Sequence, residues 1–301
     1  MADSQFYSDE DLAKLNKSFS GVMPSWAIVA DYLVVHLEAE ENAREYITHG
    51  VLRRLVMMRR CIERIYELCP PDTRKLDDPD IALDITIYLQ SFYIHMYGAF
   101  ENLARVSIEM SGIEISESEK RQASFLSKKV NSKIKKILPE PLRKYFSTEG
   151  MSSWCRHLNN FRHSLAHRIP LYIPENVLSP NKLETYQQLE KEKENLWENR
   201  DNCRRYLHED IQKKLKELSK HRKRIHAIEL EQSNLMSFSP VALHSYNEEG
   251  SHIVVFHAQI LANWNTMLDF ICLFLNEMQP PLGQQLREDL IAKDVVTFES
   301  E

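Results

Sequence analysis

The chain has 301 residues, of which 43% are hydrophobic and 27% charged, so its composition is that of a folded protein and not of a disordered one. Only 7 glycines stand against 12 prolines, which argues against an all-β fold with many sharp turns, and helix-forming residues favour an all-α fold. The formal net charge of −6 argues against a nucleic-acid-binding protein that is basic throughout, although basic residues cluster locally.

Cysteine usage and the length of the apolar runs both indicate the cytoplasm. The five cysteines are scattered and contain no CxxC pair, so we expect buried thiols rather than a disulfide framework or a zinc site. The first residues, MADSQFYSDEDL, lack the apolar run of a signal peptide. Polar residues interrupt the longest apolar stretch, 253–275, before it reaches the ~18 apolar residues that span a bilayer. We therefore expect a cytoplasmic protein without a membrane segment.

The N-terminal part of the chain predicts a lead followed by helices. Residues 1–45 are expected to form a loosely ordered lead, within which 9–17 could form a short helix, and then a helix that has Pro24 in its first turn. A helical core is expected over 46–180, with an irregularity near Gly50. Within this core, apolar residues recur at three- and four-residue spacing over 52–68, which predicts an amphipathic helix whose arginines face water.

A long helix is predicted over 81–110, and its apolar character on most sides indicates a central position. His95 in this helix is expected to be a hydrogen-bonded core histidine. Aromatic residues at helical spacing are expected to be core residues rather than a platform for stacking bases; they are Tyr88, Phe92, Tyr93, Tyr97 and Phe100. Another helix is predicted over 152–168, and Pro170 ends it.

The composition changes over 181–245, where a charged helical insertion is expected before the last core helix. Leucine, isoleucine and cysteine recur every seven residues in two series, Leu189, Leu196 and Cys203, then Ile211, Leu218 and Ile225. Either one helix of ~75 Å projects as a coiled-coil arm, or the segment folds back near Asn202 into a hairpin, which we favour. The last core helix is expected within 246–280, and 281–301 is expected to be a C-terminal tail.

The sequence RHSLAH at the end of the helix 152–168 carries the clearest chemical signal. Arg162, His163 and His167 cluster there, and the two histidines lie four residues apart on one helix face. An imidazole can move a proton to or from a ribose hydroxyl near neutral pH, and a guanidinium can hold the phosphate and its developing charge. This pairing needs no metal, so we expect no metal ion or other cofactor.

The motif resembles that of the HEPN superfamily, in which an arginine and a polar residue are followed by three or more residues and a histidine. Arg162 and His167 match its two defining positions, and His163 stands at the polar position. The helix HMYGAFENLARV, with Glu101 and Asn102 as supporting residues, is similar to the earlier bundle helix from which a polar residue commonly faces the motif.

The resemblance implies a fold, an activity and a partner. The fold would be an all-α, HEPN-like helical bundle, and active members are metal-independent endoribonucleases that join two copies of the motif in a homodimer. Many act as toxins with a protein antitoxin or as antiviral-defence effectors, whereas others keep the fold only for binding. The resemblance covers residues 46–175 and 250–280 and leaves out the charged insertion.

Other interpretations of the motif remain open at this stage. Arg162 and His167 could only stabilise the helix dipole, with Arg162 paired to Glu101. The chain could also be a non-catalytic binding or assembly module that acts through its insertion. A metal site built from His157, His163 and His167 is disfavoured because the glutamate of HExxH is missing and a guanidinium lies beside it.

Two basic clusters, Lys128 to Lys144 and Lys213 to Arg224, could contact RNA, because positively charged side chains neutralise phosphates. The residues predicted to bind RNA are Lys128, Lys129, Lys133, Lys135, Lys136 and Arg168. The second cluster, from Lys213 to Arg224, could instead pair with the acidic stretch Glu184 to Glu198 across a hairpin. Residues 182–239 could also bind a protein partner such as an antitoxin.

Overall fold

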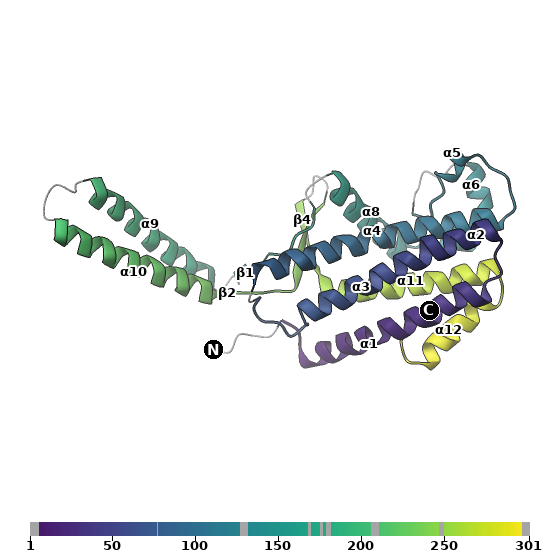
Figure 1. Ribbon diagram of the computed structural model, residues 1–301, viewed down its shortest axis with the longest axis horizontal. Helices are drawn as coiled ribbons and strands as arrows, with labels where there is room; N and C mark the ends of the chain where they lie inside the picture. Colours follow the sequence, from purple (N-terminus) through teal and green to yellow (C-terminus); the bar gives the residue numbers. More distant parts are fainter. Residues whose placement is uncertain are drawn as a thin grey trace. The chain divides into compact units, whose positions relative to one another are not determined.

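The structure is a computed structural model that is mostly helical, which confirms the all-α class, although two small two-stranded antiparallel sheets accompany the helices (Figure 1). It describes residues 6–76, 78–126, 132–167, 170–174, 177–178, 182–205, 211–246 and 250–296. The chain divides into two compact units. The bundle unit comprises Gln5–Thr73, Asp78–Ile173 and Pro240–Glu301, and the arm unit comprises Met1–Ser4, Arg74–Asp77 and Pro174–Ser239.

Four long helices form the centre of the bundle unit and lie alongside one another in Figure 1: α1 (Asp9–Asp31), α3 (Arg53–Leu68), α4 (Pro79–Met110) and α11 (Phe256–Met278). Trp264 of α11 is 1% exposed, and its indole N–H donates a hydrogen bond to the Ser25 hydroxyl of α1 at 3.0 Å. The cysteines whose side chains are described are free and buried, as expected.

Helix α1 begins at Asp9 and runs without a break through the helix that was expected to start at Pro24, so Pro24 lies inside it rather than in its first turn. Ser8 and Asp11 form a capping box, and three acidic residues occupy the first turn, so the local signals for a helix start are upstream of the proline. Leu15 and Val22 are buried, which shows that residues expected as a loose lead belong to the bundle core.

Two π-helical segments interrupt the path from α1 to α3. They are η1 (Tyr32–His36) and η2 (Tyr46–Leu52), separated by the short helix α2 (Glu41–Glu45). The irregularity predicted near Gly50 is confirmed, because Gly50 lies in η2. A side chain at Gly50 would overlap Asn102 of α4, so the missing side chain lets the two elements approach closely.

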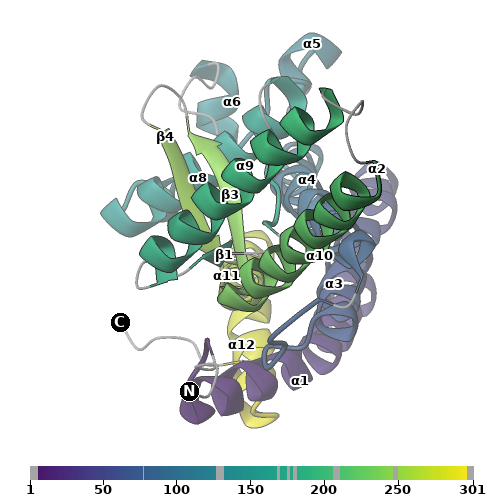
Figure 2. The same cartoon turned by 90° about the vertical axis from the view of Figure 1, so that its left-hand side faces the viewer.

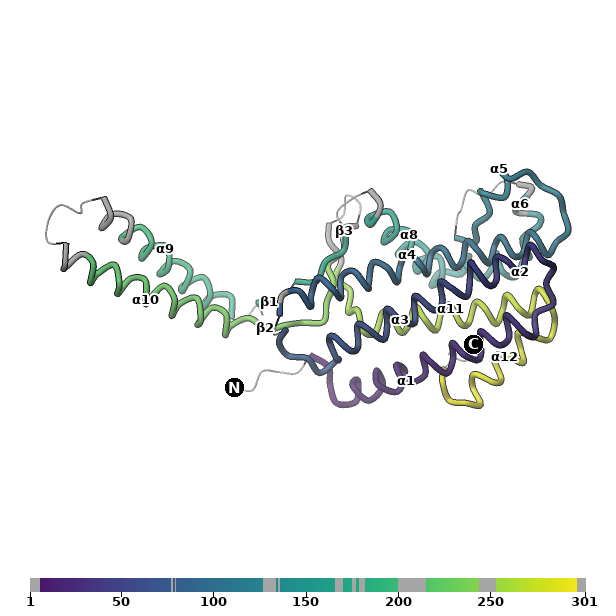
Figure 3. Tube along the Cα trace, in the orientation of Figure 1, coloured from purple at the N-terminus to yellow at the C-terminus, as the bar shows by residue number. Residues whose placement is uncertain are grey.

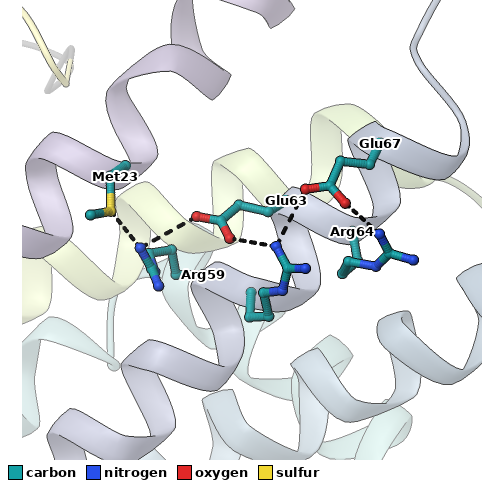
Figure 4. A network of polar contacts seen from close by, with 6 residues as sticks. Met23, Arg59, Glu63, Arg64 and Glu67 are labelled. Carbon is teal, nitrogen blue, oxygen red and sulfur yellow. Dashed lines mark hydrogen bonds and ion pairs between the residues drawn. The ribbon is translucent and has the colours of Figure 1, made fainter.

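Helix α3 has the predicted amphipathic character. Its apolar face is buried, while its charged residues form a ladder in which Glu63 pairs with Arg59 and Arg60, and Glu67 pairs with Arg60 and Arg64 (Figure 4). Arg59 also stacks over the Trp26 ring at 4.7 Å and contacts Met23 of α1. Pairs at three- and four-residue spacing add only a few tenths of a kcal/mol each, so the apolar face carries the packing.

Helix α4 is central, as predicted, and Phe92, Tyr93, Tyr97 and Phe100 are buried core residues. The prediction for His95 was wrong in one respect. Its ring is half-buried, but Nδ1 is shielded from water and has no hydrogen-bond partner within the described part of the chain. Burial and the nearby Arg54 guanidinium lower the pKa of His95.

Smaller elements cover one side of the four long helices. They are α5 (Glu117–Lys120), α6 (Ser132–Ile137), α7 (Glu140–Tyr145), α8 (Glu149–His167) and the antiparallel hairpin of β3 (Val241–Tyr246) and β4 (Gly250–Val255). Strand β3 contacts α8, and the two are close together in Figure 2. The hairpin was not predicted. Residues 251–255, expected in the last core helix, form β4, in which exposed Ile253 alternates with buried Val254.

The C-terminal segment was also predicted wrongly, since residues expected as a tail contain α12 (Leu282–Ala292). Leu282, Leu286 and Leu290 are four residues apart and buried against the bundle. Gly283 packs directly on α11, where a side chain would overlap the Cys272 carbonyl and the Asn276 amide nitrogen.

In the arm unit, the charged segment forms two helices, α9 (Leu183–Arg205) and α10 (Ile211–Leu235), which lie side by side in Figure 3. The Arg224 guanidinium binds both carboxylate oxygens of Glu192, at 2.7 and 2.9 Å. Gln232 of α10 bonds to Glu190 and Lys193 of α9. Strands β1 (Val177–Leu178) and β2 (Met236–Ser237) pair antiparallel at the base of the two helices.

Two helices, Asp9–His36 and Phe256–Met278, are long and apolar enough to cross a membrane by length and mean hydropathy. The core helix of a water-exposed bundle passes the same test, and 61% of the apolar window in the second helix is buried inside the protein. The two helices therefore do not by themselves establish a membrane protein.

A buried histidine connects α11 to the end of α3. The Nε2–H group of His257 donates to the Cys69 carbonyl at 2.6 Å, and the Tyr7 hydroxyl lies 3.4 Å from Nδ1. The Tyr66 ring packs edge-on against the imidazole. Burial lowers the pKa of His257 to about 4, so the ring is neutral in the folded protein at neutral pH.

We expect this histidine to make the protein sensitive to acid. Between about pH 6.5 and pH 4 the unfolded chain binds a proton at His257 that the folded protein does not, so the free energy of unfolding falls as the pH falls. The loss amounts to about 3 kcal/mol between pH 7 and pH 4. Urea unfolding of the wild type and His257→Gln at both pH values checks this: an equal pH dependence in the two proteins would contradict the assignment.

Candidate functional site

Helix α8 carries the motif and is held against the bundle by its aromatic face. Phe161 is fully buried and stacks on Tyr93 of α4, with ring centroids 3.8 Å apart. The Trp154 indole N–H donates to the Asn263 side-chain oxygen of α11 at 2.9 Å. These contacts fix the rotation of α8, and Arg162, next to Phe161, therefore lies at the exposed border of this interface.

Arg162 extends over the neighbouring helix. Its guanidinium carbon lies 4.7 Å from the centroid of the Tyr97 ring, and that ring is 8% exposed. A cation over an aromatic face gains about 0.5–1 kcal/mol at an exposed position. Tyr97 thus holds the guanidinium of the motif arginine, an exposed residue, against α4.

Glu101 lies one helical turn beyond Tyr97 and is half-buried. Burial raises the pKa of its carboxyl group, and the opposing influence comes from Arg162, Arg54 and Arg105. The structure therefore brings together Arg162 and Glu101, two of the residues that the sequence predicted for the site.

The structure does not show the side chains of the other predicted residues of the motif and its supporting helix next to those of Arg162 and Glu101. Asn102 is directed toward Gly50 of η2, not toward the motif, because one residue along a helix turns the side chain by about 100°. His163 is exposed on α8. His167 is the last residue of α8, and its side chain lies outside the described part of the protein.

The basic residues predicted to bind RNA are only partly described. Lys136 is exposed on α6. Lys133 and Lys135 belong to the same helix, but their side chains lie outside the described part. Lys128, Lys129 and Arg168 lie outside the described residues altogether.

Sequence reasoning missed two residues of this site, Arg54 and Arg105. Arg105 follows Glu101 by four residues on α4, a spacing that places both side chains on one helix face and could have signalled the contact. Arg54 comes from α3, and its guanidinium lies over Gly98 of α4, where a side chain would overlap it. Only the packing of α3 on α4 reveals that position.

Among the described side chains, which leave out that of His167, no three histidine, cysteine, aspartate or glutamate residues converge as a metal site would require. His157, the third ligand of the disfavoured metal interpretation, instead packs edge-on against Phe161 at 4.6 Å.

The arm unit contains a second candidate site. A groove of about 1050 Å³ runs along its helices, and its apolar lining includes Trp197, Leu218 and Ile225. Its polar lining is mainly basic, with Arg222 and Lys223 beside it. Trp197 is 37% exposed, and tryptophan is one of the residues that contribute most to binding at protein interfaces.

The fold and the site together define a mostly helical bundle with an arginine-rich cluster centred on α4. Comparisons of the chain with protein-family models, with curated proteins and with solved structures found no match. The functional argument therefore depends on the motif and on the geometry of the site.

Proposed function

We propose that this protein is a metal-independent endoribonuclease of the HEPN type. In this proposal His167 is the general acid and base, Arg162 holds the scissile phosphate and its developing charge, and His163 is a supporting polar group. The observation that carries the proposal is the position of Arg162, which α8 places over Tyr97 and beside Glu101 on the central helix.

The proposed reaction is an internal transfer within the RNA strand. A base removes the proton of the ribose 2′-hydroxyl, its oxygen forms a bond to phosphorus, and the bond from phosphorus to the 5′-oxygen breaks as that oxygen takes a proton. The products are a 2′,3′-cyclic phosphate and a 5′-hydroxyl. One Arg–His pair is too little to hold the strand and serve both proton transfers, so we propose a homodimer in which two motifs meet.

The biological setting is proposed from the motif alone. An enzyme that cuts RNA without a cofactor is suited to act in the cytoplasm as a toxin or an antiviral-defence effector, with RNA as its substrate. A toxin of this kind would need a neutralising partner, and the groove of the arm unit offers a surface where a protein antitoxin could bind.

We expect the purified protein to cleave mixed RNA in the presence of excess EDTA, because no step of the proposed reaction uses a metal. Denaturing gel electrophoresis would show the fragments, and mass spectrometry would show cyclic phosphate ends. Loss of cleavage on adding EDTA would contradict the mechanism. Sedimentation that shows only monomer under cleaving conditions would contradict the dimeric site.

The groove of the arm unit favours a second candidate function, a non-catalytic module that binds a partner protein. Apolar residues at helical spacing on α10, Leu218 and Ile225, match the way helices pack on one another. Arg222 and Lys223 on the rim would favour a partner helix with acidic residues.

This candidate predicts that removing residues 182–239 abolishes partner binding and that His167→Ala leaves binding unchanged. The charge reversals Arg222→Glu and Lys223→Glu should weaken binding by at least about tenfold, since like charges across an interface repel. Lys191→Glu, an exposed lysine on α9, is the matched control. Co-purification from cells that express each variant measures the effect. Equal recovery of the partner with all variants would reject the groove.

A further inference from the structure

Side chains from three helices meet around Glu101. Tyr97, Glu101 and Arg105 occupy successive turns of one α4 face. Arg162 reaches this face from α8, with its guanidinium over Tyr97. Arg54 reaches it from α3, with its guanidinium over Gly98. Helices α3 and α8 both pack against α4, so the two arginines flank Glu101.

The charges of this cluster do not balance. Three guanidinium groups surround one carboxylate, and within the described residues no ion pair of 4 Å or less ties Glu101 to any of them. The Nη1 atom of Arg105 is shielded from water and has no hydrogen-bond partner in the described ranges. A buried donor without a partner is unfavourable, so Arg105 has hydrogen-bonding capacity that the described residues leave unused.

We infer that Arg54, Arg105 and Arg162 form one anion-binding site and that its ligand is a phosphodiester group of RNA. Guanidinium groups present paired donors that match phosphate oxygens, and groups from three helices can surround a tetrahedral anion. The identity of the anion rests on the proposed function, but the site does not require that RNA be cleaved there. Arg54 and Arg105 would hold, together with Arg162, the phosphate that lies at the motif.

Glu101 gives the site a second property. Its carboxylate offsets part of the positive charge while the site is empty, and it repels an entering anion. Burial raises the pKa of Glu101, so it takes up a proton more readily than an exposed glutamate as the pH falls. We therefore expect anion binding to strengthen at lower pH, and Glu101→Gln to tighten binding and remove the part of that dependence that comes from Glu101. His95 lies near Arg54 and also gains positive charge as the pH falls, so His95→Gln measures its share of the dependence.

Gly98 offers a variant that moves Arg54 without removing it. A methyl group at this position would overlap the Arg54 guanidinium, which is the far end of a flexible side chain. Because alanine also favours a helix more than glycine does, Gly98→Ala should fold at least as well as the wild type. Its binding of anions should be weaker, because Arg54 is displaced.

The test measures binding of a short RNA whose riboses are 2′-O-methylated and cannot be cleaved. Fluorescence anisotropy at several salt concentrations gives the affinity and its salt slope. We expect Arg54→Ala and Arg105→Ala each to weaken binding by about tenfold and to reduce the slope by about 0.7, as for one lost phosphate contact. Inorganic phosphate should compete with the RNA. Arg53→Ala, at an exposed position of α3, is the control and should bind like the wild type.

The outcomes separate this inference from the proposed ribonuclease activity. If Arg54→Ala, Arg105→Ala and Gly98→Ala fold and bind RNA like the wild type, the anion site is wrong, whatever the cleavage assay shows. If these variants lose binding while wild-type protein never cleaves RNA, the site stands and the enzyme does not. Weaker binding by folded Glu101→Gln would also overturn the inference, because removing a repelling carboxylate can only help an anion to bind there.

Discussion

Replacing His167 by alanine is expected to reduce RNA cleavage by a factor of about 10²–10⁴, the usual contribution of a general acid or base. Arg162→Ala is expected to reduce it by about 10²–10³, because the charge that develops on the phosphate loses its stabilising partner. The measurement is the rate of cleavage of a labelled RNA by each purified variant. Expression of the wild type should also slow growth and fragment cellular RNA, and both effects should disappear in the two variants.

The controls for this prediction come from the same surfaces. His163→Ala removes a neighbouring exposed histidine and should lower the rate much less, and Arg53→Ala should leave it unchanged. Circular dichroism must show that each variant is folded. Full activity of His167→Ala would remove the motif from the mechanism. In that case the groove along the arm helices becomes the better guide to function.

Gly283→Ala is expected to lower the free energy of unfolding by about 3 kcal/mol, at the upper end of the cost of overpacking. The new methyl group would overlap the Cys272 carbonyl and the Asn276 amide nitrogen, and these backbone atoms of α11 cannot move aside as a side chain can. Urea unfolding measures the effect. The higher helix propensity of alanine would by itself raise the free energy of unfolding, so a decrease must come from the overlap.

The matched control is Gly150→Ala, which makes the same chemical change near the start of α8. Nothing lies within 4 Å of the added methyl group there, so stability should stay the same or rise slightly. Equal stability of Gly283→Ala and Gly150→Ala would show that α12 does not pack closely on α11.

Local signals in the sequence were enough for the strongest helices. The limits of α3 and α4 were predicted from the spacing of apolar residues and from the prolines and glycine that end these helices. The structure agrees with these limits. Pro24 misled the prediction because proline marks a helix start only when no better start precedes it, and Ser8 provides one. The strand β4 was mistaken for helix because the spacing of residues in a short apolar run does not distinguish a strand from a helix.

The candidate site was predictable only in part. The motif predicted Arg162, and the resemblance predicted Glu101, which the structure places near it. Arg54 and Arg105 carry no motif. Arg54 is one of several arginines in α3, all of which the sequence predicts to face water. Only the close approach of α3 to α4 at Gly98 shows that Arg54 belongs to the site. Such selection arises from tertiary packing, which a single sequence does not encode in any local pattern.

The short pairing of β1 with β2 has a consequence for how the arm could change over time. Val177, before α9, pairs with Ser237, after α10. The segment that contains these helices of 23 and 25 residues therefore begins and ends at the same place. An arm that begins and ends at the same point can be lengthened, shortened or exchanged at little cost in chain closure, which grows only slowly with loop length. The sequence and length of the arm can therefore change more freely than the residues around Glu101, which three packed helices constrain.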